Sequence, residues 1–145
     1  MRTSLNQQAF NQWEQAMKIK LNSIFVDDQS KGLKFYTEVL GFKLSKDIPM
    51  GEFRWLTVVS PEGPDDVELV LEPNANPASS VFQDSLFKQG IPITAFEVDD
   101  IQAEYERLKG LGVMFTREPM NVGVVTIAIL SDTCGNLIQL YEVTA

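Results

Sequence analysis

An internal repeat constrains the fold of this chain more than any other feature of its sequence. Residues 25–28, Phe-Val-Asp-Asp, lead through a helical pattern to Leu-Gly-Phe at 40–42. Residues 97–100, Glu-Val-Asp-Asp, lead through a second helical pattern to Leu-Gly-Val at 111–113. The two Val-Asp-Asp runs lie 72 residues apart, about half of the 145-residue chain. The chain is therefore predicted to contain one structural unit twice.

Hydrophobic periodicity supplies the elements around these runs. It predicts a helix after each Asp-Asp pair, whose carboxylates we interpret as helix caps rather than as acid–base groups. It also predicts strands at about 19–26, 42–47, 53–60, 67–72, 92–98, 113–117, 123–130 and 136–143. The element order β-α-β-β-β thus occurs twice, which predicts an α+β fold.

The predicted organisation is an N-terminal extension followed by one domain. The extension, residues 1–18, contains a predicted helix at 5–17 with an apolar stripe of Phe10, Trp13 and Met17. This stripe either packs on the chain's own domain or contacts a second copy. The domain covers 19–145, divided into module one (19–72), a linker with a short helix (73–91) and module two (92–145).

Composition and charge exclude several classes of function. There are 12 Lys and Arg against 20 Asp and Glu, a net charge of −8, which argues against nucleic-acid binding. No apolar run is long enough to cross a membrane. The single cysteine, Cys134, cannot form an internal disulfide and favours a cytoplasmic location.

The absence of histidine excludes more. It removes Ser-His-Asp and Cys-His triads and every metal site built on imidazole. No glycine-rich phosphate-binding motif is present either. Cys134 follows no base in the sequence, so a nucleophilic role is not expected.

Four segments resemble a known superfamily. They are Val-Asp-Asp at 26–28, Phe-Tyr-Thr-Glu-Val-Leu-Gly-Phe at 35–42, Val-Asp-Asp at 98–100 and Gly-Asn-Leu-Ile-Gln-Leu at 135–140. Over about 19–143 the chain resembles the vicinal oxygen chelate superfamily, which includes glyoxalase I, bleomycin-resistance proteins and extradiol dioxygenases. The resemblance implies two tandem βαβββ modules that form a curved mixed sheet around a cup, with helices outside.

Alternation along each strand predicts which side chains face the helices and which face the cup. The helix-facing side chains are predicted to be Ile24, Val26, Leu69, Leu71, Phe96, Val98, Ile127, Ile129, Ile138 and Leu140. The cup-facing side chains are predicted to be Leu21, Ser23, Phe25, Trp55, Thr57, Val59, Glu68, Val70, Glu72, Ile93, Ala95, Glu97, Thr126, Ala128, Leu130, Leu137, Gln139 and Tyr141.

The resemblance also implies four positions at which metal-dependent members hold their metal. In this sequence they are Leu21 and Ile93 on the first strands of the two modules, and Glu68 and Gln139 on the last. Two hydrocarbon side chains and one neutral amide are poor ligands for a divalent metal. We therefore expect a degenerate metal site, no bound metal and no other cofactor.

The remaining cup residues suggest a ligand site. Trp55 and Tyr141 can stack on a flat molecule, or they can belong to an ordinary core. Glu68 is a candidate catalytic base, a partner for a cation or a solvated carboxylate, and burial in an apolar cup predicts a raised pKa for it. Gln139 and Thr126 supply neutral hydrogen bonds or only a polar wall. The predicted ligand-binding residues are Leu21, Phe25, Trp55, Thr57, Glu68, Ile93, Thr126, Gln139 and Tyr141.

Three functions are compatible with this sequence. The first is a metal-independent protein that binds a small molecule, planar or cationic, in the manner of bleomycin-resistance proteins. The second is an enzyme, a glyoxalase- or dioxygenase-like lyase or oxidoreductase with a degenerate metal site. The third is an interaction module whose cup is filled by its own side chains. The resemblance implies a homodimer.

Overall fold

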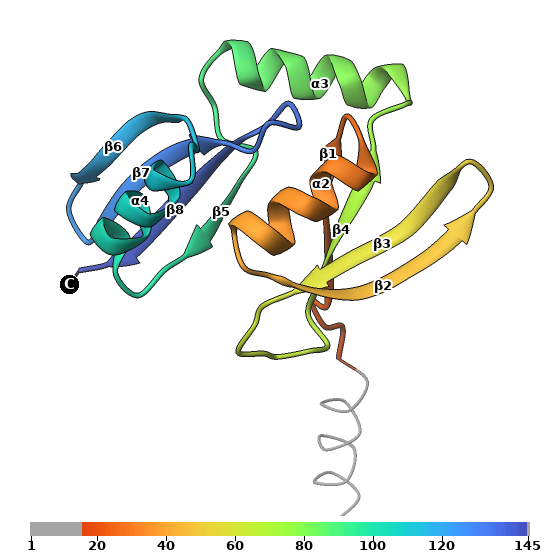
Figure 1. The fold of residues 1–145 in the computed structure, drawn as a ribbon, viewed down its shortest axis with the longest axis horizontal. Coiled ribbons are helices and arrows are strands. Elements are labelled where there is room, and N and C mark those ends of the chain that lie inside the picture. Colours follow the sequence, from red (N-terminus) through yellow and green to blue (C-terminus); the bar gives the residue numbers. More distant parts are fainter. Residues whose placement is uncertain (1–15, 145) are drawn as a thin grey trace, which may run out of the picture.

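A computed structural model describes residues 16–144 as two βαβββ units joined by a helix (Figure 1). This arrangement confirms the predicted α+β fold and the order of its elements. Module one consists of β1 (Leu21–Val26), α2 (Gln29–Lys34) with a π-helical turn η1 (Phe35–Val39), β2 (Lys43–Met50), β3 (Phe53–Val59) and β4 (Glu68–Pro73). The linker helix is α3 (Pro77–Lys88), and module two consists of β5 (Thr94–Glu97), α4 (Ile101–Gly110), β6 (Phe115–Asn121), β7 (Val125–Ser131) and β8 (Leu137–Val143).

The helix predicted at 5–17 lies outside the described residues except for its last two positions. Ala16 and Met17 are not helical, and Met17 is fully exposed. None of the helices within 16–144 is long and apolar enough to span a bilayer.

The Asp-Asp pairs cap helices, as the sequence predicts. The side chain of Asp28 accepts a hydrogen bond from the backbone N–H of Lys31 at 2.9 Å. Asp100 accepts one from the backbone N–H of Ala103 at 3.0 Å. These bonds satisfy backbone donors that an α-helix leaves free in its first turn.

The eight strands hydrogen-bond as two separate four-stranded sheets, in the orders β1-β4-β3-β2 and β5-β8-β7-β6. The first and last strands of each module pair in parallel, β1 with β4 and β5 with β8, and the remaining pairs are antiparallel. The order is the same in both sheets, so the repeat of the sequence is also a repeat of topology.

Each sheet has one face covered by a helix, and we call the opposite face of each its cup face. Alternation predicts the covered face correctly for β1, where Ile24 and Val26 are buried, and for β4, where Leu71 is buried. It is also correct for β8, where Ile138 and Leu140 are buried.

Alternation is wrong for β7. Ala128 lies directly opposite Leu140, and Leu130 lies opposite Ile138, in the antiparallel register with β8. Residues opposite each other in such a pair share a face. Ala128, Leu130 and, by the same alternation, Thr126 therefore lie on the helix-covered face, and Ile127 and Ile129 lie on the cup face.

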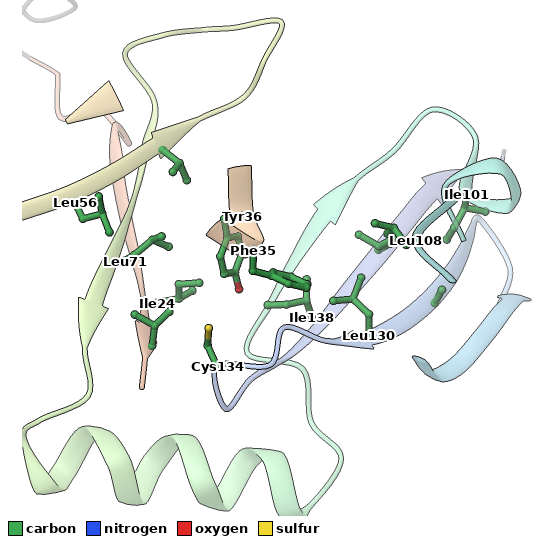
Figure 2. Packing of buried hydrophobic residues seen from close by; sticks show 14 residues of the cluster. Ile24, Phe35, Tyr36, Leu56, Leu71, Ile101, Leu108, Leu130, Cys134 and Ile138 are labelled. Atoms are coloured by element: carbon green, nitrogen blue, oxygen red, sulfur yellow. The ribbon is translucent and has the colours of Figure 1, made fainter. Parts of the chain in front are cut away.

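The two modules share one core. Figure 2 shows Cys134 between side chains of module one, such as Ile24 and Leu71, and side chains of module two, such as Ile138 and Leu130. Burial and the carboxylate of Asp132 raise the pKa of the Cys134 thiol to about 12. The thiol therefore stays protonated and acts as a small apolar side chain.

A buried polar cluster joins the modules beside this core. The Gln83 amide, on α3, donates to the carbonyl oxygen of Phe25 at 3.1 Å and to that of Cys134 at 2.9 Å. It also donates to Oδ1 of Asn136 at 3.0 Å. Asp132 accepts bonds from Tyr36 and Asn136. The linker helix thus fixes how the two sheets sit relative to each other.

Candidate functional site

The cup face of module one has an aromatic hollow of about 440 Å³. It is lined by Leu21, Asn22 and Ser23 of β1, Trp55 of β3, and Val70 and Glu72 of β4. Trp55 is half-buried and lies opposite Ile48 of β2, which is 50% exposed. The hollow therefore offers a flat apolar wall that solvent can reach.

A second hollow, also of about 440 Å³, opens between the two modules. Glu68 of β4 lines it together with Ile93 and Ala95 from module two. Ser23 lines both hollows, so the two adjoin at β1. A third hollow of about 550 Å³ lies against α4 and contains none of the predicted ligand-binding residues.

Glu68 is held as a carboxylate by neighbours in its own sheet. Lys46 Nζ donates to its Oε1 at 2.7 Å, and Thr57 Oγ1 donates to the same oxygen at 2.8 Å. These bonds, that of Lys46 first, lower the pKa of Glu68 below its usual value. The raised pKa expected from the sequence is therefore wrong, because the cup face provides a lysine that alternation did not place there.

Lys46 is the important residue that the sequence reasoning missed. A bulge interrupts the β2–β3 register between Leu44 and Lys46, so that Lys46 lies opposite Thr57. Counting alternate positions along β2 fails across such a bulge. An acidic residue predicted to face an apolar cup was nevertheless a signal that a cation lay nearby.

The structure brings together five of the predicted ligand-binding residues. Leu21 and Trp55 line the aromatic hollow, Glu68 and Ile93 line the hollow between the modules, and Thr57 is buried beneath Glu68. Phe25 is half-buried on β1 and lines none of the three hollows.

The other predicted residues lie on module two. Gln139 and Tyr141 pair with Ala95 and Glu97 on its cup face and line none of the three hollows. Thr126 lies on the opposite face, in register with Glu142. The predicted grouping of Gln139 with Thr126 is therefore wrong, since the two side chains point to opposite sides of the sheet.

The four positions implied for a metal form no complete ligand set. Leu21 pairs with Glu68 in the parallel register, but Leu21 and Ile93 have no donor atom. Within residues 16–144, no group of three or more Cys, Asp and Glu side chains is arranged to hold a metal ion. These residues do not fit a divalent cation, which needs several charged or imidazole ligands held together.

Comparison with known proteins identifies similar sequences over most of the chain. A sequence profile of the Glyoxalase/Bleomycin resistance protein/Dioxygenase superfamily matches residues 18–140. The protein YurT of Bacillus subtilis (strain 168) is 56% identical over 126 residues, which cover 87% of this chain and 99% of YurT. The lactoylglutathione lyase of Escherichia coli O157:H7 is 28% identical over 128 residues, 87% of this chain and 93% of the lyase.

Two solved structures share the fold along nearly their whole length. The crystal structure of UcmS2 is 35% identical, with a TM-score of 0.76, and the match covers 87% of this chain and 98% of UcmS2. TnmS3, an antibiotic binding protein from Streptomyces sp. CB03234, is 30% identical, with a TM-score of 0.71 and coverage of 90% and 98%.

Proposed function

Because this chain belongs to the glyoxalase/bleomycin resistance protein/dioxygenase superfamily, we propose that it binds a small, mostly apolar molecule in its cup without a metal. The observation that carries the proposal is the solvent-accessible hollow beside Trp55, lined also by Leu21, Ser23, Val70 and Glu72, which adjoins the mainly apolar hollow that Glu68 lines. Ligand sites in proteins commonly combine an apolar wall with a few fixed polar groups. The similarity to TnmS3, an antibiotic binding protein, supports the same function.

The ligand we propose is planar and need not be cationic. Trp55 offers the face on which a flat molecule can stack. Glu68, which the sequence suggested as a partner for a cation, already pairs with the ammonium of Lys46. A cationic ligand would have to compete with this internal cation, so Glu68 gives the cup no preference for a cation.

Two copies of the chain would complete the cup. Large apolar side chains remain exposed on both hairpins, including Met50 at 60% and Phe53 at 38% in module one and Met120 at 43% in module two. Extended exposed apolar surfaces commonly mark contacts with another chain. We propose a homodimer in which these surfaces are covered, and sedimentation of the purified protein tests it.

Fluorescence titration tests ligand binding directly. The chain has two tryptophans, so Trp13→Phe leaves Trp55 as the only one. Planar antibiotics should quench its emission to saturation, and calorimetric titration should show that Trp55→Leu weakens their binding by about 10-fold. If none of the planar antibiotics tested quenches the Trp55 emission to saturation at millimolar concentration, the proposed binding function is wrong.

Elemental analysis separates the binding protein from the enzyme. We expect no stoichiometric Ni, Zn, Fe or Mn in the purified protein, since Leu21 and Ile93 supply no ligand atoms. One tightly held ion per chain that is lost in Glu68→Ala would instead favour a glyoxalase- or dioxygenase-like enzyme.

A further inference from the structure

The two oxygens of the Glu68 carboxylate have different surroundings. Oε1 accepts hydrogen bonds from Lys46 Nζ at 2.7 Å, Thr57 Oγ1 at 2.8 Å and Ser45 Oγ at 3.3 Å. The backbone N–H of Lys46 donates to Thr57 Oγ1 at 3.1 Å, which leaves the hydroxyl hydrogen of Thr57 for Glu68. The carboxylate is therefore fixed through one oxygen.

The other oxygen is free to meet a ligand. Oε2 accepts no hydrogen bond from residues 16–144, and no buried side-chain oxygen or nitrogen in that range lacks a partner. Oε2 must therefore reach solvent, although the Glu68 side chain is only 15% exposed. Glu68 also lines the hollow between the modules, together with Ser23 and Ile93.

Lys46 also keeps binding capacity after it pairs with Glu68. An ammonium group has three donors, and one of them goes to Glu68 Oε1. The Lys46 side chain is 48% exposed, so a further N–H can reach a ligand. The ion pair thus presents one acceptor, Oε2, close to one donor, Nζ, while its net charge is zero.

We propose that the Lys46–Glu68 ion pair determines the ligand class of the cup. It recognises a flat neutral molecule that carries an N–H or O–H donor next to a carbonyl oxygen on one edge. The donor binds Glu68 Oε2 and the carbonyl oxygen accepts from Lys46 Nζ, while the flat body extends over Ser23 toward Trp55. This inference rests on the proposed binding function and adds the polar specificity that stacking on Trp55 alone lacks.

The ion pair should select against ligands that lack the donor and against organic cations. A ligand without the donor displaces water from Oε2 and leaves a charged acceptor unsatisfied, which is more costly than a missing apolar contact. An organic cation gains no net attraction from a neutral pair. Each kind should bind about 10-fold or more weakly than a matched molecule with both groups.

Three compounds of similar shape test the proposal by calorimetric titration. The compound 2-quinolone has adjacent N–H and carbonyl groups, N-methyl-2-quinolone lacks the donor, and N-methylquinolinium is a cation. The parent protein should bind 2-quinolone about 10-fold more tightly than either of the others. Lys46→Met should abolish the preference over N-methylquinolinium, because the unpaired carboxylate of Glu68 then attracts the cation, whereas Lys46→Arg, which keeps a charged donor, should retain most of that preference.

Lys43→Met is the matched control. Lys43 lies on the same strand, but its Nζ pairs with Oδ1 of Asp65 at 3.7 Å and takes no part in the Lys46–Glu68 pair. The preference for 2-quinolone should be unchanged in this variant. Equal binding of the three compounds to the parent, or an unchanged preference over N-methylquinolinium in Lys46→Met, overturns the inference and leaves the binding function standing. If the parent binds none of the three compounds, the inference is wrong. The fluorescence titration with planar antibiotics then tests the binding function independently.

Discussion

The hydroxyl of Tyr36 in module one donates a hydrogen bond of 2.6 Å to Oδ2 of Asp132 in module two, 96 residues further along the chain. Tyr36 and Asp132 are both fully buried. Asn136 Nδ2 donates to the same oxygen at 2.7 Å. The Asp132 carboxylate thus accepts hydrogen bonds from both modules, and the bond from Tyr36 is the one that links module one to module two.

Tyr36→Phe should destabilise the fold without removing much apolar contact. Loss of a buried hydrogen bond to a charged acceptor should lower the free energy of unfolding by about 1–3 kcal/mol. Urea denaturation measures this difference. Tyr141→Phe is the matched control, because its hydroxyl lies 3.5 Å from Glu97 at an exposed position and should contribute little. Equal stability of Tyr36→Phe and the parent would contradict the assignment.

Stability should fall at alkaline pH. The pKa of Cys134 is raised to about 12, mainly by burial, and burial together with Asp132 raises the pKa of Tyr36 well above its usual value. In the unfolded chain these groups lose their protons near pH 8.5 and 10, about their ordinary values. The contribution of both groups to stability is complete below those values and is lost as the pH rises toward the folded pKa values.

The alkaline slope can be assigned to one residue. Each group contributes at most about 1.4 kcal/mol per pH unit to the fall in unfolding free energy. Urea denaturation of Cys134→Ala between pH 7 and 11 should show a nearly level free energy up to about pH 10, where Tyr36 begins to contribute. The same slope in parent and variant between pH 8.5 and 10 would show that Cys134 is not its source.

Gly135→Ala should be more damaging than another glycine substitution in a turn. Gly135 has a φ of +97°, and a Cβ built on it would lie 2.8 Å from Nε2 of the buried Gln83. The methyl group would displace the amide that joins α3 to both modules. We expect a loss of at least about 3 kcal/mol, from backbone strain together with broken buried hydrogen bonds.

Gly51→Ala is the comparison for that experiment. Gly51 has a φ of +65°, and a Cβ there would meet nothing within 4 Å. It should lose only the backbone strain, about 1–2 kcal/mol. Thermal unfolding of the two variants measures the difference in stability. Equal losses of unfolding free energy would show that the contact with Gln83 does not destabilise Gly135→Ala.

Lys46→Met should raise the pKa of Glu68. The ammonium of Lys46 is the main cause of the lowered pKa of this carboxyl, and Thr57 is the next. NMR titration of the Glu68 side chain in both proteins measures the shift. An unchanged value in Lys46→Met would mean that the ion pair does not persist in solution.

The repeat in the sequence predicted the α+β fold and the order of its elements. The two Asp-Asp pairs cap helices, and large apolar side chains at alternate positions, Ile24 and Val26 on β1 and Ile138 and Leu140 on β8, let alternation assign the covered face correctly. In β7, residues 127–130 are Ile-Ala-Ile-Leu, apolar at every position, so alternation carries no information about orientation there. Only the register with β8 decides that Ala128 and Leu130 face the helix.

The candidate site depended more on tertiary structure. The sequence by itself determined that Leu21 and Ile93 supply no metal ligands and that Glu68 and Trp55 lie on the same face of their sheet. Only the folded sheet decided the state of Glu68, because a bulge in β2 brings Lys46 opposite Thr57 and within 2.7 Å of the carboxylate. Charge pairing across strands depends on register, and a single inserted residue shifts that register without leaving a pattern in the local sequence.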